Sequence, residues 1–468
     1  MEVCGFVTGA LRDSSVSMFS TRGDSNGDVP CSRKIGLRSK FEGLGRRIFL
    51  MSLPAILTIV GVSITAVFAI YATRVYLYTG IALRSRSKPD DPPPDEQAFV
   101  QVLIPIFNEK PRVVNRILTA CSSLDYSSYE VVVADDSDNS ETLAELSNWK
   151  FHDKIRIVHR ENREGWKGGA LRNCMNHLNP RTSHVLVFDA DFVPPPDIVE
   201  RMLSYFSGRQ IAAVQGYQLH VLNANQNWIT KAIRVMFSMG YMIDLVARMR
   251  LGSWIPLGGS VMMIRRQPME EAGGFGPELS EDLDLCVRLY LKGYKVIYVE
   301  DLRVPAECPC TVRRSIRQQM RWSEGTTRIY ARYVGRILKS PFMSVREKLE
   351  FAFHAGMYIQ AILFVVANLL LVALVVSQGG RLGSLALLIS PFVAYLALST
   401  PLAMLAGLYR EGASRSGKWV PYSLALGYVM MPFMAYAALK GLFRRDGFWH
   451  RTPKTGLVTT QSAVFPAS

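Results

Sequence analysis

Pairs of acidic side chains follow two apolar runs of this 468-residue sequence. Asp189 and Asp191 come after one run, and Asp135 and Asp136 come after the other. Residues i and i+2 at the end of a strand point to the same face, and two carboxylates held that close repel each other unless a cation lies between them. Oxygen ligands without His or Cys suit Mg²⁺ or Mn²⁺. The pattern predicts a divalent-cation site beside a nucleotide, although a solvated turn would account for either pair alone.

A third acidic cluster stands at the expected start of a helix. Ser280, Glu281 and Asp282 precede apolar residues spaced as in a buried helix, with Ser280 as the expected N-cap. Acidic groups in a first turn meet the positive end of the helix dipole. One of them could serve as a general base, and a simple capping cluster is the alternative.

A fourth group of residues combines a cation, an amide and an aromatic ring. Gln318, Arg321 and Trp322 lie within five positions. Arginine offers planar donors that match phosphate oxygens, and tryptophan offers a flat apolar face on which a sugar ring can stack. An amphipathic helix with its tryptophan in the core is the alternative.

The elements that must position these residues read as an alternating α/β domain. Five short apolar runs alternate with amphipathic stretches and predict strands, at 99–105, 130–135, 155–159, 184–189 and 211–215. Such alternation is typical of a mostly parallel sheet, which binds ligands at the carboxyl ends of its strands. The acidic pairs fall at those ends.

Long apolar runs flank this domain. One precedes it and three follow it, at 48–72, 354–377, 382–408 and 419–439. Roughly 20 apolar residues suffice to cross a bilayer as a helix. Basic residues occur on both sides of the fourth run and are expected in the cytoplasm by the positive-inside rule. We therefore expect an interfacial or re-entrant helix at 419–439.

These features divide the chain into seven parts. We expect a disordered tail, a transmembrane segment, a Pro-rich linker, the catalytic domain, an interfacial helix, a set of transmembrane or interfacial helices and a C-terminal tail, at 1–45, 46–83, 84–98, 99–335, 336–353, 354–442 and 443–468 respectively. The basic, amphipathic stretch 339–350 suits a membrane surface.

Composition excludes several classes of protein. The hydrophobic fraction is 49% and the mean hydropathy is +0.12, which excludes disorder as the main state. The net charge of +15 comes from basic residues that gather beside apolar runs, so we expect no nucleic-acid partner. The 7 cysteines are too few for a disulfide scaffold, and Cys308 and Cys310 lack a second ligand pair for zinc.

Together, the motifs resemble a known family. Asp136, Asp189-x-Asp191, Glu281-Asp282 and Gln318-x-x-Arg321-Trp322 occur in the order of the D, DxD, ED, QxxRW signature of membrane-embedded family-2 glycosyltransferases, the group of cellulose synthases and cellulose-synthase-like mannan synthases. Further segments resemble the family's lysine–glycine segment, an acceptor-side segment and the gating loop that closes over the nucleotide, at 163–171, 257–260 and 449–454.

The resemblance implies a Rossmann-like GT-A fold and a role for each residue. Asp135, Asp136 and Lys167 would contact the donor, and Asp189 and Asp191 would hold its diphosphate and the Mg²⁺ or Mn²⁺ ion. The remaining residues would supply the catalytic acids (Asp282 as base, with Glu281), the contacts to acceptor and diphosphate (Gln318, Arg321, Trp322) and the cap over the diphosphate (Thr452, Lys454).

From these residues we predict an inverting membrane glycosyltransferase. A single base without a second nucleophilic acid favours direct displacement, which turns an α-linked UDP- or GDP-hexose into a β-linked product. We expect a growing polysaccharide of β-glucan or mannan type as acceptor; a lipid acceptor, as in ceramide glucosyltransferases, is the alternative. We expect a multi-pass protein of the plasma membrane with its catalytic domain in the cytoplasm. A non-enzymatic receptor or transporter would carry charges inside its spans, and these runs have almost none.

Overall fold

The computed structural model describes residues 53–85, 98–377, 383–443 and 452–460. From Leu57 on, these residues belong to one unit. The expected disordered tail 1–45, most of the linker 84–98 and residues 449–451 of the gating-like motif lie outside the described residues, so those expectations stay predictions.

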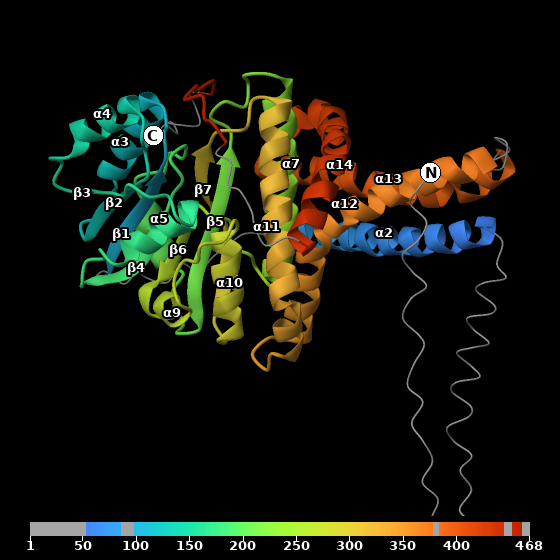
Figure 1. Cartoon of the computed structure of the whole chain (residues 1–468), viewed down its shortest axis with the longest axis horizontal. Coiled ribbons are helices and arrows are strands. Elements are labelled where there is room, and N and C mark those ends of the chain that lie inside the picture. The colour runs from blue at the N-terminus through green and yellow to red at the C-terminus, as the bar shows by residue number, and fades with distance from the viewer. Residues whose placement is uncertain (1–52, 86–97, 378–382, 444–451, 461–468) are drawn as a thin grey trace, which may run out of the picture. The chain divides into compact units, whose positions relative to one another are not determined.

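A mixed sheet forms the centre of the catalytic domain (Figure 1). Its order is β3-β2-β1-β4-β6-β5-β7, and β6 runs antiparallel to both of its neighbours while all other pairs are parallel. The strands are β1 (Phe99–Ile106), β2 (Tyr129–Asp135), β3 (Ile155–His159), β4 (Thr182–Val187), β5 (Ile211–His220), β6 (Met262–Arg265) and β7 (Lys295–Ala306). The predicted α/β GT-A class, with a mixed and mostly parallel sheet, is confirmed.

The five predicted strands are all present, but two further strands were missed. β6 has only four residues, too few for an alternating pattern, and β7 carries charged side chains among its apolar ones. The fourth strand ends at Val187, so Asp189 and Asp191 lie in the turn that follows it. β5 extends to His220, five residues beyond its predicted end.

Helices cover both faces of the sheet because successive strand residues point to opposite faces. Val131 and Val133 pack into the core under α3, α4 and α6, while Val132 and Ala134 pack into the core under α5, α9 and α10. These helices are α3 (Pro111–Ser122), α4 (Ser140–Trp149), α5 (Trp166–Met175), α6 (Ile198–Leu203), α9 (Arg266–Glu271) and α10 (Glu281–Leu291).

A second group of helices connects the sheet to the apolar segments. The group comprises α7 (Trp228–Met239), the π-helix η1 (Gly240–Leu245), α8 (Val246–Arg250) and the long α11 (Val312–Lys339). The expected separate interfacial helix at 336–353 is not formed. α11 ends at Lys339, and the next helix, which begins at Val345, continues into the apolar run.

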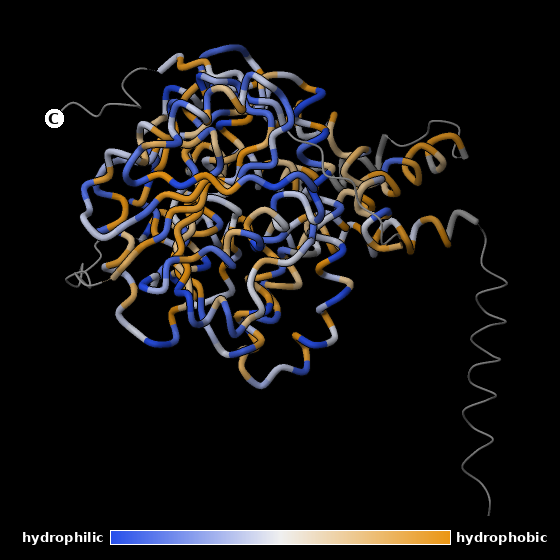
Figure 2. The backbone as a smooth tube through the Cα atoms, turned by 60° about the vertical axis from the view of Figure 1, so that its left-hand side comes forward, coloured by the Kyte–Doolittle hydropathy of each residue, from blue (hydrophilic) through white to orange (hydrophobic). Residues whose placement is uncertain are grey.

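Within the described residues, four helices are long and apolar enough to cross a membrane. The helices at the right of Figure 2 appear largely in the apolar colour. The four helices are α2 (Leu53–Arg84), α12 (Val345–Ser377), α13 (Gly383–Glu411) and α14 (Val420–Phe443), with the short η2 (Ser414–Trp419) before the last. Their burial differs: 11% of the α2 segment is buried inside the protein, against 39% of the segment that contains α14. α14 therefore packs on other parts of the chain along much of its length.

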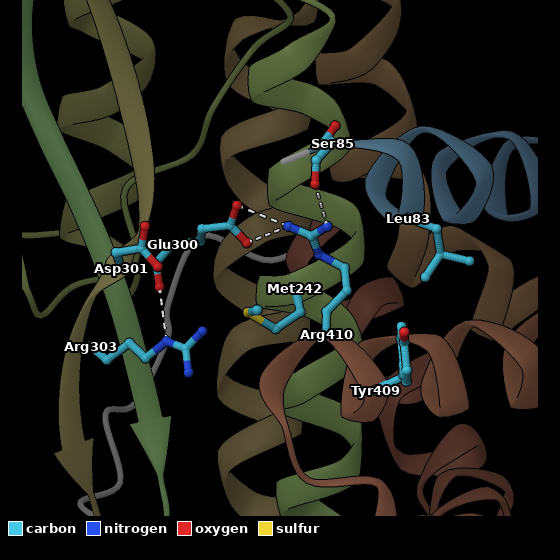
Figure 3. A pocket seen from close by; sticks show the side chains of 8 residues that line it. All are labelled: Leu83, Ser85, Met242, Glu300, Asp301, Arg303, Tyr409 and Arg410. Carbon is cyan, nitrogen blue, oxygen red and sulfur yellow. Dashed lines mark hydrogen bonds and ion pairs between the residues drawn. The ribbon is translucent and has the colours of Figure 1, made fainter. Parts of the chain in front are cut away.

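Ion pairs join the apolar helices to the catalytic domain. Arg410 at the end of α13 donates to both carboxylate oxygens of Glu300 on β7, at 2.9 and 2.6 Å (Figure 3). Arg410 also donates to the carbonyl oxygens of Ala82 and Ser85 at the end of α2. One guanidinium thus joins α2, α13 and the sheet.

Both ends of α14 contact the catalytic domain. Near its start, the rings of Tyr422 and Trp228 on α7 lie 6.2 Å apart. Near its end, Lys440 forms an ion pair of 2.9 Å with Glu324 on α11, and a Cβ on Gly441 would lie 2.5 Å from the carbonyl oxygen of Glu324. The helix that covers the predicted segment 419–439 therefore contacts the helices α7 and α11 at its two ends.

Candidate active site

The predicted aspartates of two motifs lie at one edge of the sheet, where β2, β1 and β4 end. β1 lies between β2 and β4, so chain connections leave it in opposite directions. This reversal of strand order opens a crevice at the carboxyl ends of the strands in α/β proteins. Asp135 closes β2 on one side of β1, and Asp189 follows β4 on the other.

At the β2 end, the acidic pair is held by the neighbouring strand. Asp135 accepts a 2.7 Å hydrogen bond from His159 and one of 2.9 Å from the backbone N–H of Ser137. Asp136 receives two hydrogen bonds from Arg160, at 2.5 and 2.8 Å. Asp135 and His159 are partners in the β2–β3 register, so the strand pairing itself creates these contacts.

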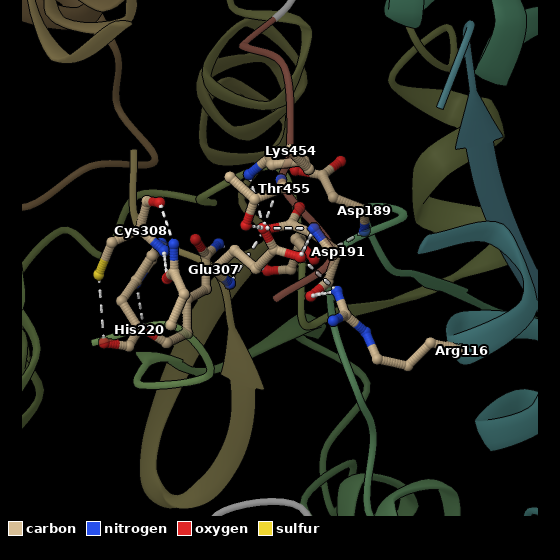
Figure 4. Close-up of polar contacts among 12 residues, drawn as sticks. Arg116, Asp189, Asp191, His220, Glu307, Cys308, Lys454 and Thr455 are labelled. Carbon is tan, nitrogen blue, oxygen red and sulfur yellow. Dashed lines mark hydrogen bonds and ion pairs between the residues drawn. The ribbon is translucent and has the colours of Figure 1, made fainter. Parts of the chain in front are cut away.

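At the β4 end, two lysines hold the Asp189-x-Asp191 motif. Lys167 Nζ lies 2.7 Å from Asp189 Oδ1, and Lys454 Nζ lies 2.6 Å from Asp191 Oδ2. Figure 4 shows Lys454 reaching Asp191 from the C-terminal segment. Burial alone would lower the pKa of Lys454, but the Asp191 carboxylate raises it, so the ammonium stays charged.

Lys167 links the aspartate motif to the start of α10. Its ammonium donates to the carbonyl oxygen of Gly259 at 2.7 Å and lies 3.2 Å from Glu281 Oε1. Burial opposes its charge, yet Asp189, Glu281 and Asp282 together raise the pKa of Lys167. The structure therefore brings the predicted donor-binding and catalytic residues into one charged cluster.

Two glycines permit this close approach. A Cβ on Gly168 would lie 2.2 Å from the carbonyl oxygen of Gly276, so only glycine lets α5 approach the loop before α10. Gly259 has a φ of +76°, and a Cβ there would lie 2.9 Å from Asp282 Oδ2. The lysine–glycine segment and the 257–260 segment thus have a physical reason for their small residues.

Asp282 lies at the start of α10, and the pKa of its carboxyl is raised above the usual value. Burial raises the pKa of its carboxyl to about 7, helped by the negative charge of Glu281 and opposed by Lys167. A general base works best when its pKa lies near the operating pH. Ser280 precedes the helix as predicted, but its side chain makes no capping hydrogen bond; a Cβ on Gly325 of α11 would lie 2.2 Å from its Oγ.

α11 carries the predicted Gln318, Arg321 and Trp322, and of these Arg321 lies within the field of the acidic cluster. Burial lowers the pKa of Arg321, while Glu281, Asp189 and Asp282 act in the opposite direction, which places this guanidinium in the field of the acidic cluster. Gln318 is buried. The Trp322 ring packs edge-on against Phe237 of α7, with ring centroids 6.1 Å apart.

Sequence reasoning missed four side chains that hold the predicted ones in place. His159 ends the short strand β3 and Arg160 follows it, and a parallel β2–β3 pair places them beside Asp135 and Asp136. Glu307 and Arg116 form an ion pair of 2.7 Å behind Asp191. No sequence pattern pointed to Glu307, because the strand that ends just before it was not predicted.

The carboxylates fit a divalent cation only with help from a ligand. Among the described residues, no group of three or more His, Cys, Asp or Glu side chains could enclose a metal ion. Mg²⁺ is commonly bound through one or two carboxylates together with substrate phosphates and water. Asp191 and Asp189, which both lie against ammonium groups, match that kind of incomplete donor set.

Comparison with known proteins gives the class of this domain. Residues 94–325 match the model of the family described as glycosyltransferase like family 2. The chain therefore contains a domain of the family-2 glycosyltransferase type.

The similar proteins include plant mannan-synthesising enzymes. Glucomannan 4-beta-mannosyltransferase 7 of Arabidopsis thaliana is 32% identical over 260 residues, covering 53% of this chain and 46% of that protein. Glucomannan 4-beta-mannosyltransferase 1 of Oryza sativa subsp. japonica is 27% identical over 327 residues, covering 64% of this chain and 62% of that protein. The chain spans about half to two thirds of the length of these curated relatives.

A solved structure shares the fold. The mannosyltransferase PcManGT from Pyrobaculum calidifontis, in complex with GDP-Man and Mn²⁺, is matched with a TM-score of 0.56 at 20% sequence identity. The match covers 83% of this chain and 100% of that chain. The neighbour therefore supports the GT-A architecture of the catalytic domain.

Proposed function

We propose that this chain is an inverting hexosyltransferase that extends a β-linked polysaccharide from a nucleotide-sugar donor, with GDP-mannose as the preferred donor. The observation that carries the proposal is the charged cluster in which Lys167 joins Asp189 to Glu281 beside Asp282. Donor-binding and proton-accepting groups lie within reach of one substrate there. The choice of mannose rests on the similarity to glucomannan mannosyltransferases.

In the proposed reaction, an acceptor hydroxyl attacks the anomeric carbon of the donor sugar. Asp282 takes the hydroxyl proton as the new glycosidic bond forms, and the bond from carbon to the diphosphate oxygen breaks on the opposite face of the ring. The configuration therefore inverts, and the nucleoside diphosphate leaves with its electron pair. Glu281 keeps the pKa of Asp282 raised and faces Lys167, so it does not compete as a nucleophile.

Charge neutralisation of the leaving group is the second task of the site. A divalent cation bound to Asp191, with Asp189 nearby, would supply positive charge to the diphosphate. Arg321 and Lys454 would donate charge-assisted hydrogen bonds to its oxygens. Asp135 and Asp136, already fixed by His159 and Arg160, would orient the nucleoside. Gln318 and Trp322 would border the acceptor.

We further propose that the catalytic domain and the C-terminal tail share the cytoplasmic side of the membrane. The contacts of both α14 ends with α7 and α11 support an interfacial α14. α2, α12 and α13 would then supply the membrane anchorage. The plasma membrane is the proposed compartment, because an extruded glycan would leave the cell directly from it.

The proposal is tested with purified full-length protein in lipid nanodiscs. Radiolabelled GDP-mannose and UDP-glucose are supplied separately with Mg²⁺ or Mn²⁺, and products are sized by gel filtration and digested with a β-mannanase. A long, mannanase-sensitive product from GDP-mannose is expected. A single hexose on a lipid would establish the alternative acceptor, and no transfer from either donor would refute the proposal.

A further inference from the structure

The C-terminal segment 452–460 lies on the catalytic domain, although it is far from that domain in sequence. Lys454 reaches Asp191 after β4, and the backbone N–H of Thr459 donates to the carbonyl oxygen of Leu222 after β5 at 2.7 Å. In the sequence, this segment comes after α14 and does not continue from a strand of the sheet. The side chain of Lys454 is too flexible to fix the position of this segment by itself. Other contacts between the segment and the domain must therefore fix it.

Glu307, just after β7, provides that hold. Its carboxylate accepts hydrogen bonds from the backbone N–H of Thr455 at 2.8 Å, from the Thr455 hydroxyl at 3.0 Å and from the backbone N–H of Gly456 at 3.0 Å (Figure 4). Arg116 donates to the same carboxylate at 2.7 Å. The side chain of Glu307 is 1% exposed, so its charge is compensated inside the protein, by these donors and by the nearby Lys454 ammonium.

The same residue also contacts the proposed metal ligand. The backbone N–H of Glu307 donates to Asp191 Oδ2 at 3.1 Å, and Lys454 lies 2.6 Å from that same oxygen. Glu307 thus fixes Thr455 on one side and Asp191 on the other. Because Lys454 directly precedes Thr455, holding Thr455 also sets the position of the Lys454 ammonium.

A buried carboxylate in this position depends on its donors. Hydrogen bonds to a charged group contribute more than neutral ones, and a buried charge that loses its partners is costly. Three of the four donors come from the C-terminal segment or its hydroxyl. A glutamine would keep one carbonyl oxygen but would present N–H groups toward the N–H groups of the segment. The geometry therefore selects a carboxylate.

From these contacts we propose that Glu307, with Arg116 behind it, is a positioning residue that fastens residues 455–456 to the catalytic domain and so places Lys454 over the diphosphate site. The consequence for donor binding rests on the function proposed above. The attachment of residues 455–456 to the domain does not depend on the proposed function, and it can be measured without substrate.

The test uses the full-length protein in nanodiscs with a nitroxide label at Val458→Cys, a position that is 38% exposed. Cys4 and Cys31 are replaced by serine, since the other five cysteines are buried. The spectrum should show an immobilised label in this background and a mobile label in Glu307→Gln. Glu300→Gln is the matched control, because Glu300 is a buried carboxylate of β7 that pairs with Arg410 instead of the segment.

A second variant acts from the segment side and leaves the domain unchanged. Thr455→Pro removes the backbone N–H and the hydroxyl that Glu307 accepts, and it should also free the label. A label that stays immobilised in both variants, or that becomes mobile in Glu300→Gln as well, would overturn the proposal.

Donor kinetics then connect the fastening to the site. With GDP-mannose, Glu307→Gln should raise the donor KM about 10-fold with a smaller change in kcat, since one charge-assisted contact is misplaced. Glu300→Gln should leave the donor KM unchanged. If the label is freed by Glu307→Gln but the unmodified protein transfers no sugar, the fastening stands and the proposed function fails.

Discussion

The two ends of the polar site are built differently. At the β2 end, the carboxylates of Asp135 and Asp136 take their partners from positions 24 residues away on the adjacent strand. At the β4 end, Asp191 takes its ammonium partner from a position 263 residues away, beyond the apolar helices. The β2 end is therefore complete as soon as the sheet forms, whereas the β4 end also needs the C-terminal segment in place.

This difference predicts separate roles for the two ends, with donor binding at the β2 end and the transfer step at the β4 end. Groups fixed by strand register lose little entropy when a ligand binds, which would favour binding of the nucleoside in the proposed mechanism. In the proposed mechanism, the groups at the β4 end lie where charge develops during transfer, and preorganised charge there would lower the barrier most. Changes at the β4 end should hence affect turnover strongly, and changes at the β2 end should affect donor affinity modestly.

The largest effect is expected for Asp191→Asn. The amide removes a negative charge from the proposed metal site, and transfer should fall by about 10³-fold or more. Mn²⁺ binding, followed by electron paramagnetic resonance in the presence of GDP, should weaken in parallel. Full activity of the unmodified protein in excess EDTA would contradict the metal site.

Asp282→Asn should lower kcat by about 10²–10⁴-fold, because loss of a general base typically costs that much. Donor binding should persist, since the amide is nearly isosteric. The turnover of the unmodified protein should rise with pH through about 7, because the raised pKa of Asp282 keeps its carboxyl protonated below that pH and ionised above it. Equal turnover at pH 5 and pH 8 would exclude Asp282 as the base.

Lys454→Met should lower kcat/KM for the donor by about 10–100-fold, since it removes one charge-assisted hydrogen bond to the diphosphate. Deletion of residues 449–468 should do the same or more while the catalytic domain stays folded. Lys440→Met is the control, because Lys440 pairs with Glu324 and does not contact Asp191. Equal losses in both variants would show that Lys454 has no specific part.

The smallest effect is expected at the β2 end. Arg160→Lys replaces a bidentate partner of Asp136 by a single ammonium, and the donor KM should rise about 3–10-fold with kcat nearly unchanged. Competition by free GDP measures the same loss without turnover. A large fall in kcat would show that the β2 end also contributes to the transfer step, against the division of roles proposed for the two ends.

Local patterns were sufficient for much of the fold. The run of apolar residues before Asp135 and the run before Asp189 each predicted a strand, because a strand that is buried on both faces of the sheet has a short, continuous apolar run. The long apolar helices could also be predicted, because their length and composition are properties of a single segment. β6 was not predicted, because its four residues adopt the strand conformation through pairing with β4 and β5 on either side.

The sequence by itself determined the local setting of the candidate residues: Asp135 ends a strand, Glu281 and Asp282 begin a helix, and Gln318, Arg321 and Trp322 lie within one helix. Only the tertiary structure decided their partners. That Lys167 joins Asp189 to Glu281, and that Glu307 fastens the segment carrying Lys454, depends on contacts between elements far apart in the chain. Such contacts follow from packing and close approach, as at Gly168 and Gly259, and leave no periodic trace in the sequence.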